Sequence, residues 1–100
     1  MNSAPLAPAE MELLRSVFRR HSEISSVKIF GSRAKGTHTP RSDVDLALWG
    51  ELNDLQAEQI AAELEELPLP YRYDVQRFEG IHPDPLRGHI ERVGIPIYAR

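Results

Sequence analysis

The sequence contains no cysteine. This absence excludes disulfide frameworks, thiolate zinc sites and cysteine nucleophiles together, and it is compatible with a reducing cytoplasm. No stretch approaches about 18 consecutive apolar residues, so the sequence offers no membrane-spanning helix, and the first residues lack the basic and apolar segments of a secretion signal. We therefore expect a soluble, cytoplasmic protein with no membrane partner.

A large excess of charge of either sign is also missing. The net charge is −3, from 12 Lys and Arg against 15 Asp and Glu, so the chain lacks the global basic field of a protein that coats nucleic acid. An apolar fraction of 41% is ordinary for a globular protein. A length of 100 residues predicts a single domain spanning residues 1–100.

Hydrophobic periodicity alternates between helical and strand-like along the chain. The expected elements, in order, are a helix over 8–21, a strand over 26–30, a strand over 43–49, a helix N-capped by Asn53 and ended by Pro68, a strand over 71–78, a helix N-capped by Asp84, and an edge strand over 95–98. This alternation predicts an α/β (α+β) fold with one sheet packed against helices.

Three aspartates are candidates for a metal centre. Asp43 and Asp45 are two apart on one expected strand, so their side chains point the same way from Cα atoms about 7 Å apart. Oxygen ligands without Cys or paired His favour Mg²⁺ or Mn²⁺. If the strand carrying Asp74 lies beside them, the three carboxylates reach the minimum for a two-metal site. The alternatives are that Asp43 and Asp45 are exposed side chains on the solvent-facing side of a strand, and that Asp74 forms an ion pair with Arg72 or Arg77.

A basic loop lies just before these aspartates. No Asp or Glu occurs from residue 24 to residue 42, and this window contains Lys28, Arg33, Lys35 and Arg41. A strand that ends at Gly31 and turns into a short helix would aim backbone N–H groups at an anion, with Ser32 adding a hydroxyl donor. The loop then holds a polyphosphate that metal ions join to the aspartates. The alternative is an ordinary polar turn with Ser32 as an N-cap.

The combined pattern of "GSRAKG", a spacer, "SDVDLAL" and a later aspartate resembles the nucleotidyltransferase superfamily of DNA polymerase β. The short length resembles its minimal nucleotidyltransferase (MNT) branch. The resemblance spans residues 27–48 and reaches Asp74. It implies a small mixed β-sheet packed against helices, a polymerase-β-type fold.

The resemblance also implies roles for individual residues. Asp43 and Asp45 would ligate two Mg²⁺ ions, with Mn²⁺ as a possible substitute, and Asp74 would be the third catalytic carboxylate and metal ligand, which helps to activate the acceptor hydroxyl. The nucleotide-binding residues would be Gly31 and Ser32, at the triphosphate, and Arg33 and Lys35, at positions where the family often has basic residues.

The implied reaction is in-line attack of a hydroxyl on the α-phosphorus of a metal-bound nucleoside triphosphate, expected to be ATP. Family members of this size resemble antitoxins that add AMP to a partner toxin with a HEPN domain. Two alternatives remain open. One is a non-catalytic binding module that neutralises its partner by contact; the other is a nucleic-acid 3′-end nucleotidyltransferase. The acidic composition and the lack of a stacking-aromatic platform make nucleic acid an unexpected partner.

Overall fold

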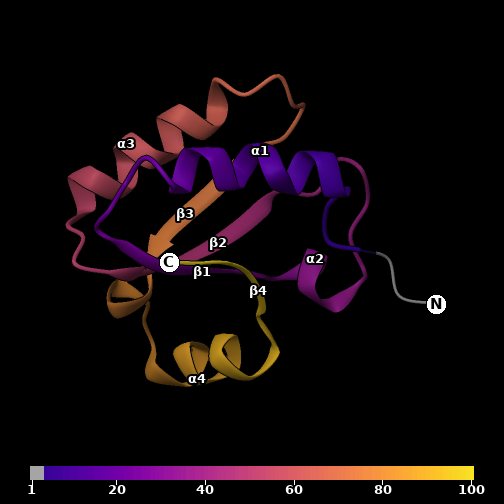
Figure 1. The fold of residues 1–100 in the computed structure, drawn as a ribbon. Coiled ribbons are helices and arrows are strands. Elements are labelled where there is room, and N and C mark those ends of the chain that lie inside the picture. Colours follow the sequence, from indigo (N-terminus) through magenta and orange to yellow (C-terminus); the bar gives the residue numbers. More distant parts are fainter. Residues whose placement is uncertain (1–3) are drawn as a thin grey trace.

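The computed structural model describes residues 4–100, which form one four-stranded sheet with helices on both faces (Figure 1). The elements are α1 (Pro8–Phe18), β1 (Ile24–Phe30), α2 (Ser32–Lys35), β2 (Val44–Gly50), α3 (Asp54–Glu65), β3 (Tyr73–Arg77), the 3-10 helix η1 (Phe78–Gly80), α4 (Asp84–Val93) and β4 (Ile95–Ala99). The strand order is β3-β2-β1-β4. β1 is antiparallel to β2 and β4, whereas β2 and β3 are parallel. The expected mixed sheet is confirmed.

The apolar core is divided between the two faces of the sheet. α1 and α3 cover one face, and η1 and α4 cover the other (Figure 1). The core under α1 and α3 includes Leu14, Val17, Phe18, Val27, Ile29, Val44, Leu46, Leu48, Ile60 and Leu64. The smaller core under α4 contains Ala47, Ile81 and Ile90, and the Trp49 ring stacks on Phe78 with 4.4 Å between centroids. The expected alternation along β1 and β2 is therefore confirmed, since successive side chains enter different cores.

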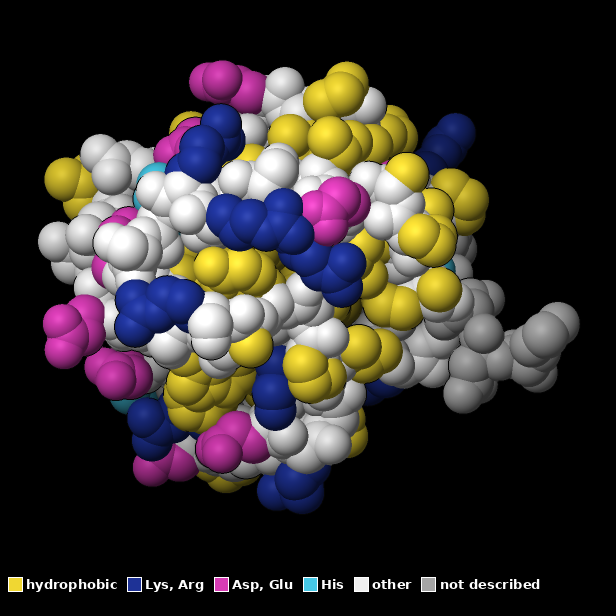
Figure 2. Space-filling model, viewed as in Figure 1, with side chains coloured by type: hydrophobic (Ala, Val, Ile, Leu, Met, Phe, Trp, Pro, Cys, Tyr) yellow, Lys and Arg dark blue, Asp and Glu magenta, His cyan; other side chains and the backbone are white. Residues whose placement is uncertain are grey.

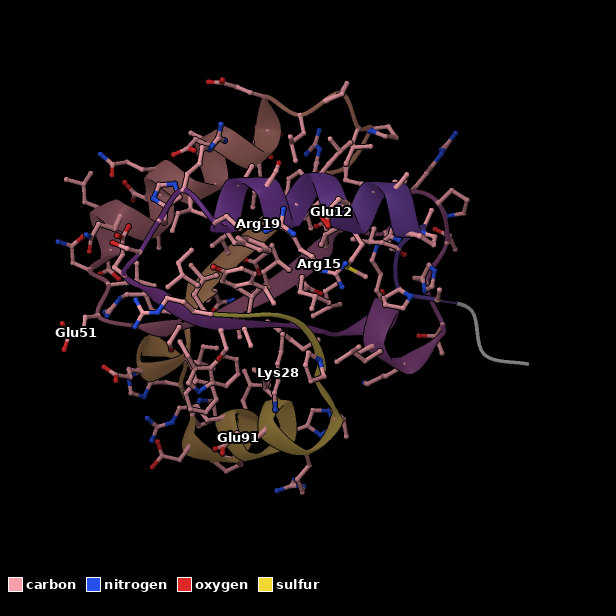
Figure 3. The ribbon with its side chains drawn as sticks, in the orientation of Figure 1. Glu12, Arg15, Arg19, Lys28, Glu51 and Glu91 are labelled. Atoms are coloured by element: carbon pink, nitrogen blue, oxygen red, sulfur yellow. The ribbon has the colours of Figure 1, made fainter. Side chains whose placement is uncertain are left out.

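Polar contacts link the helices to the sheet at its periphery (Figure 3). Arg15 Nε of α1 donates to the Ile97 carbonyl of β4 at 2.7 Å, and Lys28 Nζ of β1 donates to the Glu91 carbonyl of α4 at 3.1 Å. Lys and Arg side chains are interspersed with Asp and Glu on the face drawn in Figure 2. No helix in the described part of the chain is both long and apolar enough to span a bilayer.

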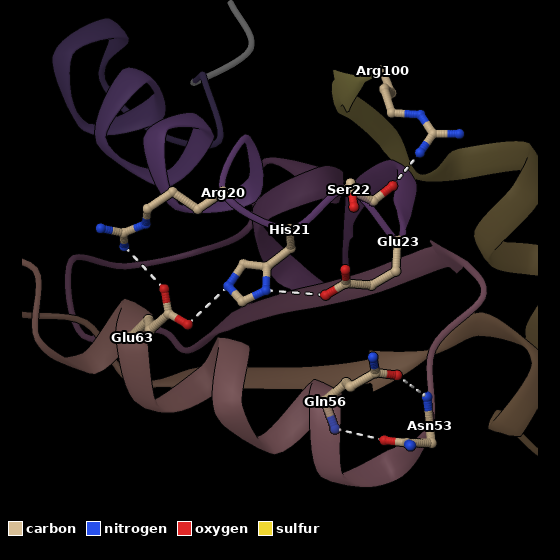
Figure 4. A network of polar contacts seen from close by, with 8 residues as sticks. All are labelled: Arg20, His21, Ser22, Glu23, Asn53, Gln56, Glu63 and Arg100. Atoms are coloured by element: carbon tan, nitrogen blue, oxygen red, sulfur yellow. Dashed lines mark hydrogen bonds and ion pairs between the residues drawn. The ribbon is translucent and has the colours of Figure 1, made fainter.

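α1 is shorter than the sequence suggests. It was expected to run over 8–21 but ends at Phe18. Past Phe18 the backbone tightens, because the N–H groups of Arg20 and His21 donate to carbonyls three residues earlier. The His21 ring then lies between two carboxylates: Nδ1 is 3.1 Å from the nearby Glu23 and Nε2 is 2.8 Å from Glu63 of α3 (Figure 4).

The expected N-cap of α4 is wrong. Pro83 occupies the cap position, and Asp84 is instead the first helical residue, where its carboxylate pairs with Arg87 one turn later. The Pro83 carbonyl accepts from the Leu86 N–H at 3.0 Å, and no side chain caps the helix. The strand expected over 71–78 is also shorter: it begins at Tyr73 and ends at Arg77, since Phe78 already begins η1.

The expected N-cap of α3 is confirmed. The Asn53 side chain accepts from the Gln56 N–H, and the Gln56 side chain accepts from the Asn53 N–H, each at 2.8 Å (Figure 4).

Replacing Asn53 by Ala should lower the free energy of unfolding by about 1 kcal/mol. Urea unfolding checks this, with the exposed Gln59→Ala of the same helix as control. Equal stabilities of the two variants would show that the cap contributes nothing.

Candidate active site

The parallel pairing of β2 with β3 places two of the three predicted carboxylates opposite one another. Asp45 is the register partner of Asp74, so both side chains leave the sheet on the same face. This is the face covered by α4, because Ala47, two residues after Asp45, belongs to the core under that helix. Asp43 precedes β2 directly and is exposed. The expectation that the strand of Asp74 lies beside that of Asp45 is confirmed.

The carboxylates act on one another electrostatically. Partial burial raises the pKa of Asp45 above its ordinary value, and the negative charges of Asp74 and Asp43 raise it further, while the Arg33 guanidinium partly offsets them. A carboxylate in this setting is more favourable when a cation neutralises it. Within residues 4–100, however, no three acidic, His or Cys side chains are grouped closely enough to hold a metal ion as they stand.

Asp74 and Arg77 of β3 each contact a different polar neighbour. Gln76 Nε2, on the same face of β3, donates to Asp74 Oδ2 at 3.2 Å. Arg77 points to the opposite face and pairs with Asp54 of α3 at 2.8 Å. Arg77 is thus committed elsewhere and does not neutralise Asp74. Gln76 was not among the sequence candidates, although its i, i+2 spacing from Asp74 on a strand was the signal for it.

The glycine that ends β1 packs directly on Asp45. Gly31 has φ 73° and ψ −151°, a region that residues with a Cβ rarely adopt. A Cβ built there would lie 2.2 Å from Asp45 Oδ2. The absence of a side chain at Gly31 therefore lets the loop after β1 pack closely against the Asp45 carboxylate. Gly31 also occupies the N-cap of α2, so the alternative reading of Ser32 as the cap is wrong, and Ser32 is the first helical residue.

Replacing Gly31 by Ala is expected to displace Asp45 as well as strain the backbone. Gly36→Ala is the matched control, because Gly36 also has a positive φ, 76°, but nothing lies within 4 Å of its Cβ position. Both variants should lose about 1–3 kcal/mol of stability from backbone strain. Only Gly31→Ala should also lose at least about 10-fold in nucleotide affinity, measured by titration calorimetry. Equal affinities in the two variants would contradict the role given to the close approach.

The two basic candidates of the loop are placed very differently. Lys35 is exposed. Arg33 is only 3% exposed, and its guanidinium donates to the carbonyls of Ser42 at 3.0 Å, Pro5 at 2.9 Å and Thr39 at 3.5 Å. The Arg33 guanidinium also lies 4.6 Å from the centre of the Tyr71 ring. Arg33 therefore joins the N-terminal segment, α2 and the segment before Asp43. No sequence pattern indicates these contacts, since the acceptors are backbone groups.

A family sequence model matches most of the chain. The sequence model described as polymerase beta, nucleotidyltransferase, matches residues 12–100. The chain belongs to this nucleotidyltransferase family, which confirms the resemblance inferred from the "GSRAKG" and "SDVDLAL" motifs. No curated protein sequence matches the chain.

Solved structures share the fold at low sequence identity. A toxin–antitoxin structure with AMP-PNP is 18% identical with a TM-score of 0.73, over 95% of this chain and 75% of the other. A tri-AMPylated Shewanella oneidensis HEPN toxin in complex with its MNT antitoxin gives 13% identity and a TM-score of 0.71, over 95% and 74%. A putative nucleotidyltransferase from Sulfolobus solfataricus gives 22% identity and a TM-score of 0.55, over 90% and 77%. The polymerase-β-type fold is confirmed.

Proposed function

We propose that this chain transfers AMP from ATP to a hydroxyl group on a HEPN-domain partner protein and thereby silences it as an antitoxin. The observation that carries the proposal is the meeting of three features at one point. Asp45 faces Asp74 across adjacent strands, and the Gly31 loop packs on the Asp45 carboxylate. The similar structures, which include a complex with AMP-PNP and an AMPylated HEPN toxin, supply the nucleotide and the partner class.

We assign the metal-binding role to Asp43, Asp45 and Asp74. Their oxygen donors suit Mg²⁺ or Mn²⁺. Burial, followed by the charges of Asp74 and Asp43, raises the pKa of Asp45, and a carboxylate in that setting favours binding of cations. Two bound ions would neutralise the phosphates and stabilise the charge that develops on the attacking and leaving oxygens.

The remaining site residues position the nucleotide and the acceptor. The Ser32 hydroxyl would donate to the triphosphate, and the ammonium of the exposed Lys35 would pair with it. Asp74, exposed at the edge of the sheet, takes the proton of the acceptor hydroxyl. The acceptor oxygen then bonds to the α-phosphorus, the bond to the bridging oxygen breaks, and pyrophosphate leaves. Arg33 is fixed on backbone carbonyls, so we give it the task of positioning the loop rather than contacting phosphate.

ATP labelled at either the α- or the γ-phosphate distinguishes nucleotidyl from phosphoryl transfer. Wild-type protein, Mg²⁺ and the host's HEPN-domain protein should give a labelled protein band from the α label only. Asp43→Asn should lose the band, while Glu66→Gln, at an exposed acid that ends α3 on the opposite face of the sheet, should keep it. A band labelled from γ-ATP, or an undiminished band in Asp43→Asn, would overturn the proposal.

A contact-only antitoxin is the competing reading. It predicts that the HEPN-domain protein is inhibited equally by wild type and by Asp43→Asn, without ATP. Asp45 lies opposite Asp74, and its carboxylate packs against Gly31, a position where a Cβ would collide with it. This arrangement favours the enzyme, because binding by contact does not require it. Transfer to nucleic acid would instead label added RNA and leave protein unlabelled.

A further inference from the structure

A groove of about 460 Å³ runs along the outer edge of β3, between this strand and α3. All of Tyr73–Arg77 line it, together with Ala57 and Ala61 of α3. Successive side chains of a strand point to opposite faces, so a groove that touches five successive residues follows the backbone edge rather than either face.

This edge is open for pairing. β3 ends the described sheet and is hydrogen-bonded to β2 alone. In residues 4–100, no turn, loop or inter-element backbone hydrogen bond reaches Tyr73–Gln76. The N–H and C=O groups directed away from β2 are therefore available to an added strand. The side of α3 that faces them carries two alanines, which leaves room for another chain.

The groove is negatively charged. Asp74 and Glu58 line it without a basic partner in the described part of the chain, whereas Asp54 is neutralised by Arg77 at 2.8 Å. Pairing of β3 with the same strand of a second copy would bring these uncompensated acids together, and a nucleic-acid backbone would be repelled. A basic polypeptide is the complementary occupant.

We propose that this groove binds an extended, basic segment of the partner protein, which adds to the edge of β3 as a strand and carries the acceptor hydroxyl. The proposal rests on the proposed function and specifies how its substrate is recognised. A strand paired with β3 lies beside Asp74, the group that takes the hydroxyl proton, and main-chain hydrogen bonds would fix its register. A Lys or Arg near the acceptor residue would face Glu58.

The groove can be blocked without touching the carboxylates of the site. Ala61→Trp fills it, and Ala62→Trp is the control, since Ala62 is exposed on the same helix but outside the groove. Glu58→Lys reverses its charge, with the exposed Glu91→Lys on α4 as control. Ala61→Trp and Glu58→Lys should each raise the KM for the host's HEPN-domain protein about 10-fold or more, with kcat and the affinity for Mg·ATP unchanged. Amide hydrogen exchange of 73–77 should slow when the partner binds.

Two failures are distinguishable. If wild type labels the partner and Ala61→Trp has the same KM as Ala62→Trp, or if amide exchange in β3 is unchanged, the groove is not the docking site and the proposed function stands. If wild type neither binds nor labels the partner, the proposed function fails, and this inference fails with it.

Discussion

Replacing Asp45 by Asn is expected to abolish transfer and, at the same time, to stabilise the metal-free protein. Loss of a charged ligand opposite Asp74 should lower kcat/KM by about 10²–10³-fold or more, since the charge of the transition state then lacks its support. Without metal, the same carboxylate is partly buried beside two other negative charges. A neutral amide of nearly the same shape removes that repulsion, so the free energy of unfolding should rise.

The gain in stability should depend on pH in a defined direction. The pKa of Asp45 is raised in the folded state above its ordinary value of 3.8, so the folded protein binds more protons than the unfolded chain between these two values. The contribution of Asp45 to wild-type stability therefore falls as pH rises through that window and then becomes constant. The difference between Asp45→Asn and wild type should vanish below about pH 3.8 and be complete at neutral pH.

Urea unfolding in EDTA at pH 3 and pH 7, together with the α-label transfer assay, measures both effects. Asp43→Asn is the matched control: it should lose transfer as well, but its carboxylate is exposed, so its gain in stability should be smaller. An Asp45→Asn protein that is less stable than wild type at pH 7 would show that this carboxylate supports the fold, and its assignment to the site would lose its electrostatic basis.

The sequence predicted the carboxylates better than it predicted their surroundings, for a physical reason. The i, i+2 spacing of Asp43 and Asp45 fixes a common face by strand geometry alone. The neighbour of Asp45, in contrast, depends on strand order, because β3 could have paired with either edge of the sheet. Alternation of apolar and polar residues predicts a strand, but it does not indicate which other strand pairs with it. The register of Asp45 with Asp74 had to come from the structure.

Two features that differ from the expectation share a source, which is contact with other segments of the chain. The helix expected to reach His21 ends earlier, and the imidazole contacts Glu63 on α3. Arg33 is basic and follows Gly31, which predicts a phosphate ligand, but its guanidinium is buried on backbone carbonyls, and the phosphate role stays a prediction. Local patterns report local preferences, and tertiary contacts overrode both of them.

Arg33→Met is the second substitution with a large expected effect. It keeps most of the side-chain volume but leaves the carbonyls of Pro5, Thr39 and Ser42 without their donor. Arg33 is buried and its hydrogen bonds are partly buried, so we expect a loss of about 2–3 kcal/mol, which lowers Tm by on the order of 10 °C in a domain of this size. Thermal unfolding followed by circular dichroism measures this change.

Lys35→Met separates the positioning role of Arg33 from a phosphate contact. Lys35 is exposed, so its replacement should leave Tm within about 2 °C of wild type and raise the KM for ATP. Arg33→Met should instead lower kcat at temperatures where it is still folded, because the Ser42 carbonyl that Arg33 holds immediately precedes Asp43. Arg33→Lys keeps the charge but cannot reach three carbonyls at once, so it should restore little stability. Full recovery of both Tm and kcat in Arg33→Lys would mean that the charge beside Asp45, and not the fork of hydrogen bonds, is what the site requires from this residue.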